Sequence, residues 1–427
     1  MGTRQEYVRR IKETEACKIW YDTLENFFVT HGGLTMNSEN LYLLAQERKE
    51  HLVALRRNIH KHPELDFNCE NTAQLVEKEL DALGIEHYRA AKTGVVGILR
   101  GQKKGKTIAF RADMDALPVS EKNEASYVSE IEGCMHACGH DVHTASLLGA
   151  ASLLTDFRDN LSGTVKFFFQ PAEETDGGAL PMIEENVMDS PKVDAVFGLH
   201  CDPQLEAGTV GVGYGKFRAA SDMFHIIIHG TGSHGAQPHR GIDAVAIGSE
   251  MVASLQQVVS RRSSPFDPVV ITVGSFHAGT AGNIIADRAE MRGIIRTMDP
   301  DTRIFTRALV RRIVQNIPDA LGAIGEINFT EGYPSLINDE EMTNLVAECG
   351  RQLLGAANVQ VMKEPEMGVD DFAYFLQKAP GAYFLLGTGN KEKGFTHPLH
   401  SPYFDVDEKC LPIGAAILAA VALQFLN

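Results

Sequence analysis

The chain has 427 residues, of which 44% are hydrophobic and 22% are charged, and its formal net charge is −16. These shares are ordinary for a globular protein, and the length exceeds what one hydrophobic core usually covers, so we predict two domains. The negative charge argues against nucleic acid or an anionic membrane as a partner. Seven cysteines without regular spacing, a start that lacks a signal-peptide core and the absence of a membrane-length apolar run predict a cytoplasmic protein.

The first part of the chain predicts an extension followed by two helices. Residues 1–36 mix charged and aromatic side chains without a clear pattern, and we interpret them as a segment without chemistry. Apolar residues then recur at helical spacing over 41–60, and Pro63 stops the run. A second helix is expected over 69–83.

Strand and helix signals alternate in the next stretch. Four runs that are apolar on both faces predict strands near 94–99, 107–112, 164–169 and 193–199, with a helix over 140–157. Such runs, separated by helices, indicate a largely parallel sheet that is covered on both faces. We therefore predict an α/β domain.

The pattern changes near Gly215, where an alternating strand begins. Four alternating strands and two helices predict an inserted α+β domain of ferredoxin-like layering over 217–331. The metal-binding catalytic domain is then discontinuous, with the ranges 37–216 and 332–427, and it ends in a buried helix.

The segment from Cys134 to Ala145 crowds thiol and imidazole groups before an apolar helix. A Cys-Gly-His triplet at a helix start can direct Cys138 and His140 to one metal ion, and the helix amino end favours the thiolate. A buried structural cysteine is the alternative interpretation.

Polar side chains also follow the predicted strands. Asp113 and Asp115 come after one strand, Glu173 and Glu174 after the next, and His200 after the last. Ligands of open α/β sheets bind at such carboxyl ends. With His400 in a late loop, the set suits zinc, manganese, cobalt or nickel, although each residue alone is also compatible with a solvated turn.

Six ordered motifs resemble the amidohydrolase branch of the M20 metallopeptidases, which includes hippurate hydrolases, N-acetyl-amino-acid and N-acetyl-diaminopimelate deacetylases, and plant auxin-conjugate hydrolases. The resemblance covers about residues 40–425. The motifs are Arg57-Asn-Ile-His-Lys-His-Pro-Glu, Arg111-Ala-Asp-Met-Asp-Ala-Leu-Pro, Met135-His-Ala-Cys-Gly-His-Asp, Gln170-Pro-Ala-Glu-Glu, Gly198-Leu-His and His400-Ser-Pro-Tyr-Phe-Asp-Val-Asp-Glu.

This resemblance implies two divalent metal ions per subunit. Cys138 would bridge them, His140 and His200 would complete one ion, and Glu174 and His400 would complete the other. It also implies that Glu173 is the general base and that Asp115 steadies an imidazole.

In the inserted domain, the resemblance implies that His234 steadies an oxyanion, commonly in the site of a partner subunit, and that Asn283 and Arg296 hold the substrate carboxylate. A homodimer formed through the inserted domain follows from this reading. Without the resemblance, a glycine-rich turn, a capping amide and a surface arginine would be the simpler interpretations.

These features predict metal-dependent hydrolysis of the amide bond of N-acyl amino acids. Alternatives are a dipeptidase or carboxypeptidase with the same residues, a cysteine hydrolase that uses Cys138, and a non-catalytic metal-binding protein. Asp370 stands where the branch typically has glutamate. If it shapes the substrate pocket, specificity shifts while the chemistry remains.

Overall fold

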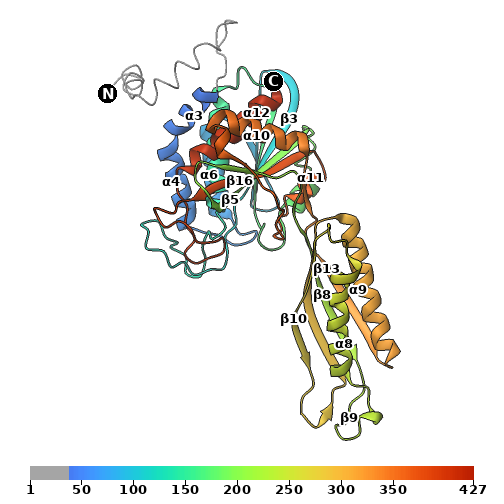
Figure 1. The fold of residues 1–427 in the computed structure, drawn as a ribbon. Helices are drawn as coiled ribbons and strands as arrows, with labels where there is room; N and C mark the ends of the chain where they lie inside the picture. Colours follow the sequence, from blue (N-terminus) through green and yellow to red (C-terminus); the bar gives the residue numbers. More distant parts are fainter. Residues whose placement is uncertain (1–37) are drawn as a thin grey trace. The chain divides into compact units, whose positions relative to one another are not determined.

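The computed structural model describes residues 38–427 (Figure 1). The predicted extension, 1–36, lies outside the described residues. Two separate sheets organise the described part, and each has its own hydrophobic core.

The larger sheet has eight strands in the order β1-β2-β4-β3-β5-β16-β6-β15. Its central pairs β4-β3, β3-β5 and β5-β16 are parallel, whereas β1-β2 and β2-β4 are antiparallel. Because β3, β4 and β5 run in parallel, their carboxyl ends meet at one edge. The strands are β1 (Glu86–Ala90), β2 (Gly94–Arg100), β3 (Lys103–Asp113), β4 (Ser162–Gln170), β5 (Ala195–Glu206), β6 (Val210–Val212), β15 (Val359–Val361) and β16 (Gly381–Gly389).

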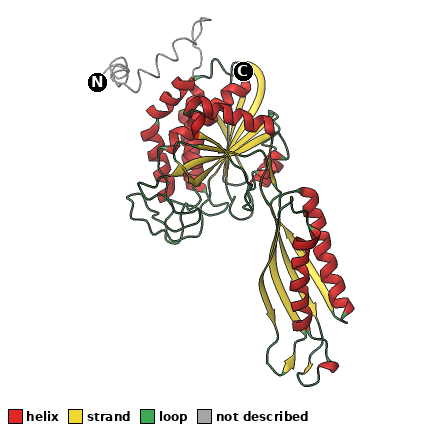
Figure 2. Ribbon diagram, viewed as in Figure 1, coloured by secondary structure: helices red, strands yellow, loops and turns green. Residues whose placement is uncertain are grey.

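Helices cover both faces of this sheet, as Figure 2 shows in red. One core cluster joins one face to α3 (Ser38–Glu47), α4 (Lys49–Lys61), α5 (Glu70–Ala82), α6 (His140–Asp156), α10 (Glu340–Leu354) and α12 (Cys410–Leu426). A second cluster joins the opposite face to α7 (Ala179–Glu184) and α11 (Ala373–Leu376). The helices α6 and α12 are buried along nearly their whole length: α12 is apolar almost all round, and α6 is apolar after a polar first turn.

The predicted helix over 41–60 is divided into α3 and α4 at Arg48. The Arg48 guanidinium donates to Ser152 Oγ on α6 at 3.0 Å, so the side chain at the break ties α6 to the helix pair.

The smaller sheet is antiparallel, in the order β10-β12-β8-β13. Buried and more exposed residues alternate along β8, and its buried residues pack under two helices that start at the N-caps Asp243 and Asp299. The elements are β8 (Ala220–His229), α8 (Ala244–Gln257), β10 (Val269–Ala278), β12 (Arg288–Thr297), α9 (Pro300–Ala320) and β13 (Ile324–Glu331).

A short two-stranded sheet pairs β9 (Ser233–His234) with β11 (Ile284–Ile285). Another pairs β7 (Gly215–Arg218) with β14 (Leu336–Asn338), where the chain leaves the first sheet and returns to it. The expected fold class is confirmed: a mixed sheet covered by helices and a second α+β layer. Within residues 38–427, no helix is both long and apolar enough to cross a membrane.

Candidate active site

The candidate site forms where β3, β4 and β5 come together with the start of α6. Asp113 is the last residue of β3, and only Pro171 and Ala172 separate the end of β4 from Glu173 and Glu174. His200 lies inside β5 rather than at its end, because the strand continues to Glu206 in register with β16. The end of a strand therefore could not be located from the apolar run alone.

Gly139 shapes the start of α6. It is the N-cap residue with φ of +86°, and a Cβ there would lie 2.8 Å from Cys201 Sγ. A residue with a side chain would be strained and crowded in this position. Glycine therefore allows Cys138 and His140 on either side of it to turn toward the same place.

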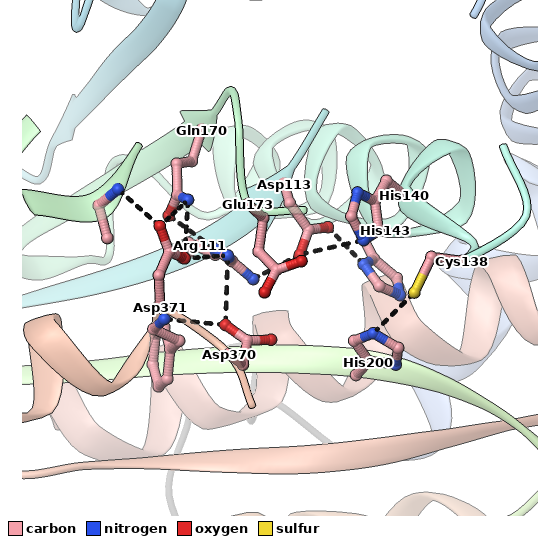
Figure 3. Close-up of polar contacts among 12 residues, drawn as sticks. Arg111, Asp113, Cys138, His140, His143, Gln170, Glu173, His200, Asp370 and Asp371 are labelled. Carbon is pink, nitrogen blue, oxygen red and sulfur yellow. Dashed lines mark hydrogen bonds and ion pairs between the residues drawn. The ribbon is translucent and has the colours of Figure 1, made fainter. Parts of the chain in front are cut away.

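Two groups of potential metal ligands share Cys138. The donor atoms of Cys138, His140 and His200 lie within 4.8 Å of one another, and so do those of Cys138, Glu174 and His400. Figure 3 shows Cys138 beside His200, and the distance from Sγ to Nε2 is 3.5 Å. The structure thus brings together all five residues that the resemblance implied as metal ligands. His397 lies outside both groups and packs its ring against Tyr403.

Hydrogen bonds fix which imidazole nitrogen of each histidine faces the cluster. His140 Nδ1 lies 2.8 Å from the carbonyl oxygen of Asp115, and His200 Nδ1 lies 2.8 Å from that of Cys201. Both Nδ1 atoms therefore donate, which leaves Nε2 unprotonated on a neutral ring. His140 Nε2 and Glu174 Oε1 are among the buried side-chain atoms of residues 38–427 that have no hydrogen-bond partner of good geometry, although His400 Nε2 lies 3.3 Å from Glu174 Oε1.

Those two atoms test whether the residues fit a metal. Buried polar atoms normally have partners, and these two lie 3.8 Å from each other beside the Cys138 thiol, as the ligand atoms of one ion would. A set of sulfur, imidazole and carboxylate donors suits borderline divalent ions. The residues fit such ions.

The Asp115 carboxylate mainly contacts backbone N–H groups, whereas the resemblance implied that it steadies an imidazole. Its carboxylate accepts the backbone N–H groups of Glu173 and Glu174, each at 3.0 Å, and its carboxylate oxygen is 3.5 Å from His140 Nδ1. The preceding Ala172 has φ of +59°, an uncommon value for alanine. Asp115 therefore holds this bend in the backbone and touches the imidazole mainly through its own carbonyl.

A buried arginine connects the strand ends (Figure 3). Arg111 donates to Asp113 at 2.5 Å and to Asp371 at 2.8 Å, and its Nε donates to Gln170 at 2.9 Å. Asp371 also accepts from Gln170 and from the backbone of Ala179. The network thus fixes both ends of the loop that carries Glu173 and Glu174.

His143 also lies close to His140 but is not free to bind a metal. Its Nδ1 is 2.5 Å from Asp113 Oδ1, and its Nε2 accepts the backbone N–H of Cys201 at 2.8 Å. Both ring nitrogens are therefore occupied. His143 steadies the strand next to His200, a role that the motif Gly-His-Asp-Val-His did not reveal.

Glu173 is buried beside two other carboxyl groups. Its carboxylate lies within 4.8 Å of those of Asp370 and Asp371. Burial and the negative charge of Asp370 raise the pKa of Glu173 well above its usual value, although Arg111 opposes the shift. A carboxyl group with a raised pKa can both accept and return a proton near neutral pH.

Asp370 is buried and belongs to this carboxyl cluster. It is 2% exposed, accepts from the Tyr383 hydroxyl at 2.5 Å and lies 3.3 Å from Arg111. The shorter side chain at this position thus bears on the surroundings of Glu173.

The Cys138 thiol is poorly suited to be a nucleophile without a cation. Burial and the carboxylates of Glu174 and Glu173 raise its pKa well above 9.0. A bound cation would instead favour the thiolate.

The residues expected from the inserted domain do not lie together. His234 and Asn283 are exposed and adjacent, because His234 pairs with Ile284 and the N–H of Gly235 donates to the carbonyl of Asn283 at 2.8 Å. Arg296 lies near the other end of β12, where it pairs with Ser221 on β8. It is eight residues, or about 27 Å along the strand, from Arg288, which follows shortly after Asn283 and β11. Its guanidinium donates to Ser221 Oγ at 2.8 Å.

Comparison of the chain with protein-family models, with known proteins and with solved structures points to one family. Residues 109–424 match the model of peptidase family M20/M25/M40. The chain is 43% identical to thermostable carboxypeptidase 1 of Saccharolobus solfataricus over 90% of this chain and 97% of that protein. It is 45% identical to the N-acyl-L-amino acid amidohydrolase of Geobacillus stearothermophilus over 72% and 83% of the respective lengths.

A solved structure supports the same assignment. A dinuclear metal-binding peptidase of the M20 family from Bacillus subtilis superposes with a TM-score of 0.79 at 35% identity, covering 89% of this chain and 99% of that one. The chain belongs to peptidase family M20/M25/M40.

Proposed function

We propose that the protein hydrolyses the amide bond of N-acyl amino acids, with two divalent metal ions held by Cys138, His140, His200, Glu174 and His400. One observation carries this proposal: two candidate ligand groups share Cys138, and the buried carboxyl group of Glu173 lies beside them, within 4.8 Å of His140 and Glu174. The amidohydrolase relative from Geobacillus stearothermophilus supports this substrate class.

Bound divalent ions would supply Lewis-acid chemistry, which lowers the pKa of water and polarises an amide carbonyl. Glu173 would take the proton from the attacking water and return it to the departing amine. The raised pKa of its carboxyl group suits both steps. Asp115 would keep Glu173 and Glu174 in place through their backbone N–H groups.

The His234 ring can donate a hydrogen bond from Nε2. Its Nδ1 accepts from the backbone N–H of Ala236 at 3.0 Å, so the neutral ring carries its proton on Nε2. An exposed Nε2–H group suits an oxyanion that develops on the substrate. His234 lies on β9, at the far end of the inserted domain in Figure 1, and this place supports a homodimer in which His234 and Asn283 serve the partner's site.

Arg296 would hold the free carboxylate of the substrate. Burial lowers the pKa of Arg296 below its usual value, yet an arginine keeps its charge at any working pH. The guanidinium has one neutral partner, Ser221 Oγ, and one backbone carbonyl, so it is not neutralised by an acid within hydrogen-bond distance in the described chain.

A carboxypeptidase is the second candidate. The 43% identity to thermostable carboxypeptidase 1 favours it, and a peptide with a free C-terminal carboxylate presents the same groups as an N-acyl amino acid. The two activities differ in what lies on the acyl side of the bond.

The test measures release of free amino acid from N-acetyl, N-benzoyl and N-aminoacyl forms of the same amino acids. Chelator-stripped protein is assayed before and after reloading with zinc, manganese, cobalt or nickel. Activity that disappears on stripping and returns with metal supports the proposal, and the preferred acyl group separates the two candidates. Activity that survives chelator but is lost on thiol alkylation would favour Cys138 as a nucleophile.

A further inference from the structure

Arg56 on α4 forms a buried charged centre next to the candidate site. Its side chain is fully buried, and Nε donates to Asp141 at 2.7 Å. Nη2 donates to Asp405 at 3.1 Å, and Nη1 lies 3.5 Å from Glu408. The ring of Tyr127 lies 4.9 Å from the guanidinium carbon, and its hydroxyl donates to Asp405 at 2.8 Å.

The partners of Arg56 belong to the two segments that carry candidate ligands. Asp141 directly follows His140 at the start of α6. Asp405 lies five residues after His400 in the loop that leads to α12. One guanidinium therefore joins the segment of Cys138 and His140 to the segment of His400.

The two candidate ions depend on this link to different degrees. The rings of His140 and His200 are fixed by backbone carbonyls in or beside the sheet. Asp141 keeps a second partner, because His60 Nδ1 lies 2.7 Å from its carboxylate.

His400 has weaker support. Its side chain is 55% exposed, and its ring contacts Glu174 at 3.3 Å. Its φ of +65° is uncommon for a histidine, and its backbone N–H donates to Ala137 at 2.8 Å. The position of this ring therefore depends on how the loop is anchored.

We propose that Arg56 is a positioning residue of the metal centre: it holds the His400 loop against the start of α6 and thereby sets the affinity for the ion of Glu174 and His400. The ion of His140 and His200 depends on Arg56 much less. This inference rests on the proposed function, because it assumes that the two ligand groups bind metal.

The experiment titrates chelator-stripped full-length protein with zinc and follows heat release and bound metal per chain. Arg56→Lys keeps the charge but removes the forked donor geometry. Asp405→Asn keeps Arg56 paired with Asp141 and weakens the link to the loop, together with the hydrogen bond that Asp405 accepts from Tyr127. Arg89→Gln is the control, because Arg89 is also held by two carboxylates, those of Glu77 and Glu70, but both lie on α5 and not in the His400 loop.

Wild type and Arg89→Gln should bind two ions. We assign the weaker ion to Glu174 and His400 and the tighter ion to His140 and His200. Arg56→Lys and Asp405→Asn should bind the weaker ion at least about tenfold less tightly than wild type and the tighter ion within about threefold of wild type. Because only metal affinity is lowered, excess zinc should restore kcat of both variants to within about twofold of wild type. A purely structural defect would instead lower kcat without changing the half-saturating zinc concentration. Circular dichroism checks folding.

Wild-type affinity for both ions in folded Asp405→Asn, or an equal loss of both ions, would overturn the role of Arg56. If Arg56→Lys does not fold, Asp405→Asn decides the question. Failure of the wild type to bind two ions would instead overturn the metal centre itself, and the inference with it, so the two failures are distinguishable.

Discussion

The two sheets of this protein bury different kinds of side chains. Within residues 217–331, the buried polar residues are Asp222, Thr297 and Thr306, whereas the rest of the described chain buries arginines, a lysine, histidines and many carboxylates. The inserted region has an ordinary apolar core and keeps His234 and Asn283 exposed, while Arg296 is half-buried. Around the larger sheet, charged side chains are buried because groups of opposite charge hold one another in position around the candidate site. Removing these groups from water costs free energy.

The largest effect should follow from a change inside the charged region. Glu173→Gln removes the proposed base while it keeps the size of the side chain, and kcat should fall by about 10³–10⁴-fold. Bound metal and thermal stability should stay close to wild type. Steady-state kinetics and metal analysis check this, with the exposed Glu184→Gln as the control. Substantial turnover in Glu173→Gln would mean that another group moves the proton.

An exposed residue of the inserted region should matter to activity without affecting folding. His234→Ala should lower kcat by about 10²–10³-fold, because an oxyanion donor is lost, and leave the melting temperature unchanged.

Mixing subunits tests where His234 acts. Refolding equal amounts of His234→Ala and Glu173→Gln chains should recover up to about a quarter of wild-type activity, because half of the random dimers contain one site with both groups intact. No recovery from mixed dimers would place the action of His234 within its own subunit.

Stability should respond to a change of buried charge in one region and of apolar volume in the other. Arg111→Met leaves Asp113 and Asp371 without their shared cation and should lower the unfolding free energy by about 3–5 kcal/mol.

Met251→Ala, in the apolar core of the inserted region, should lower the unfolding free energy by about 2–5 kcal/mol through lost packing. Urea unfolding measures both, and exposed Arg292→Met should change little. A mild effect of Arg111→Met would show that the carboxylates can protonate or rearrange.

The smallest effect concerns Lys166, a buried ammonium group on β4 that donates to the carbonyl of Val187 at 2.7 Å. Burial lowers its pKa from 10.5 to about 8. Between these values the unfolded chain binds the extra proton, so this residue makes wild-type stability rise with pH. Relative to Lys166→Met, wild type should therefore gain up to about 3 kcal/mol between pH 7.5 and pH 10.5. A pH-independent difference in unfolding free energy would contradict the shift.

Much of the architecture followed from the sequence. Apolar periodicity predicted most helices and strands, and the change to alternating strands indicated the second layer, because these patterns reflect which face of each element is buried. The ordered motifs implied a set of five candidate ligands that the structure brings together. Element ends were less certain, as the continuation of β5 through His200 shows, because strand ends depend on the neighbouring strand β16.

Only the tertiary structure decided how the motif residues divide their tasks. His143 is excluded as a ligand because the N–H of Cys201 occupies its Nε2. Asp370 belongs to the surroundings of Glu173 because Arg111 and Tyr383 hold it there. The contacts of Arg111 join residues that are up to 260 positions apart in the chain. The order of strands in the sheet sets them, and no local pattern in the sequence records that order.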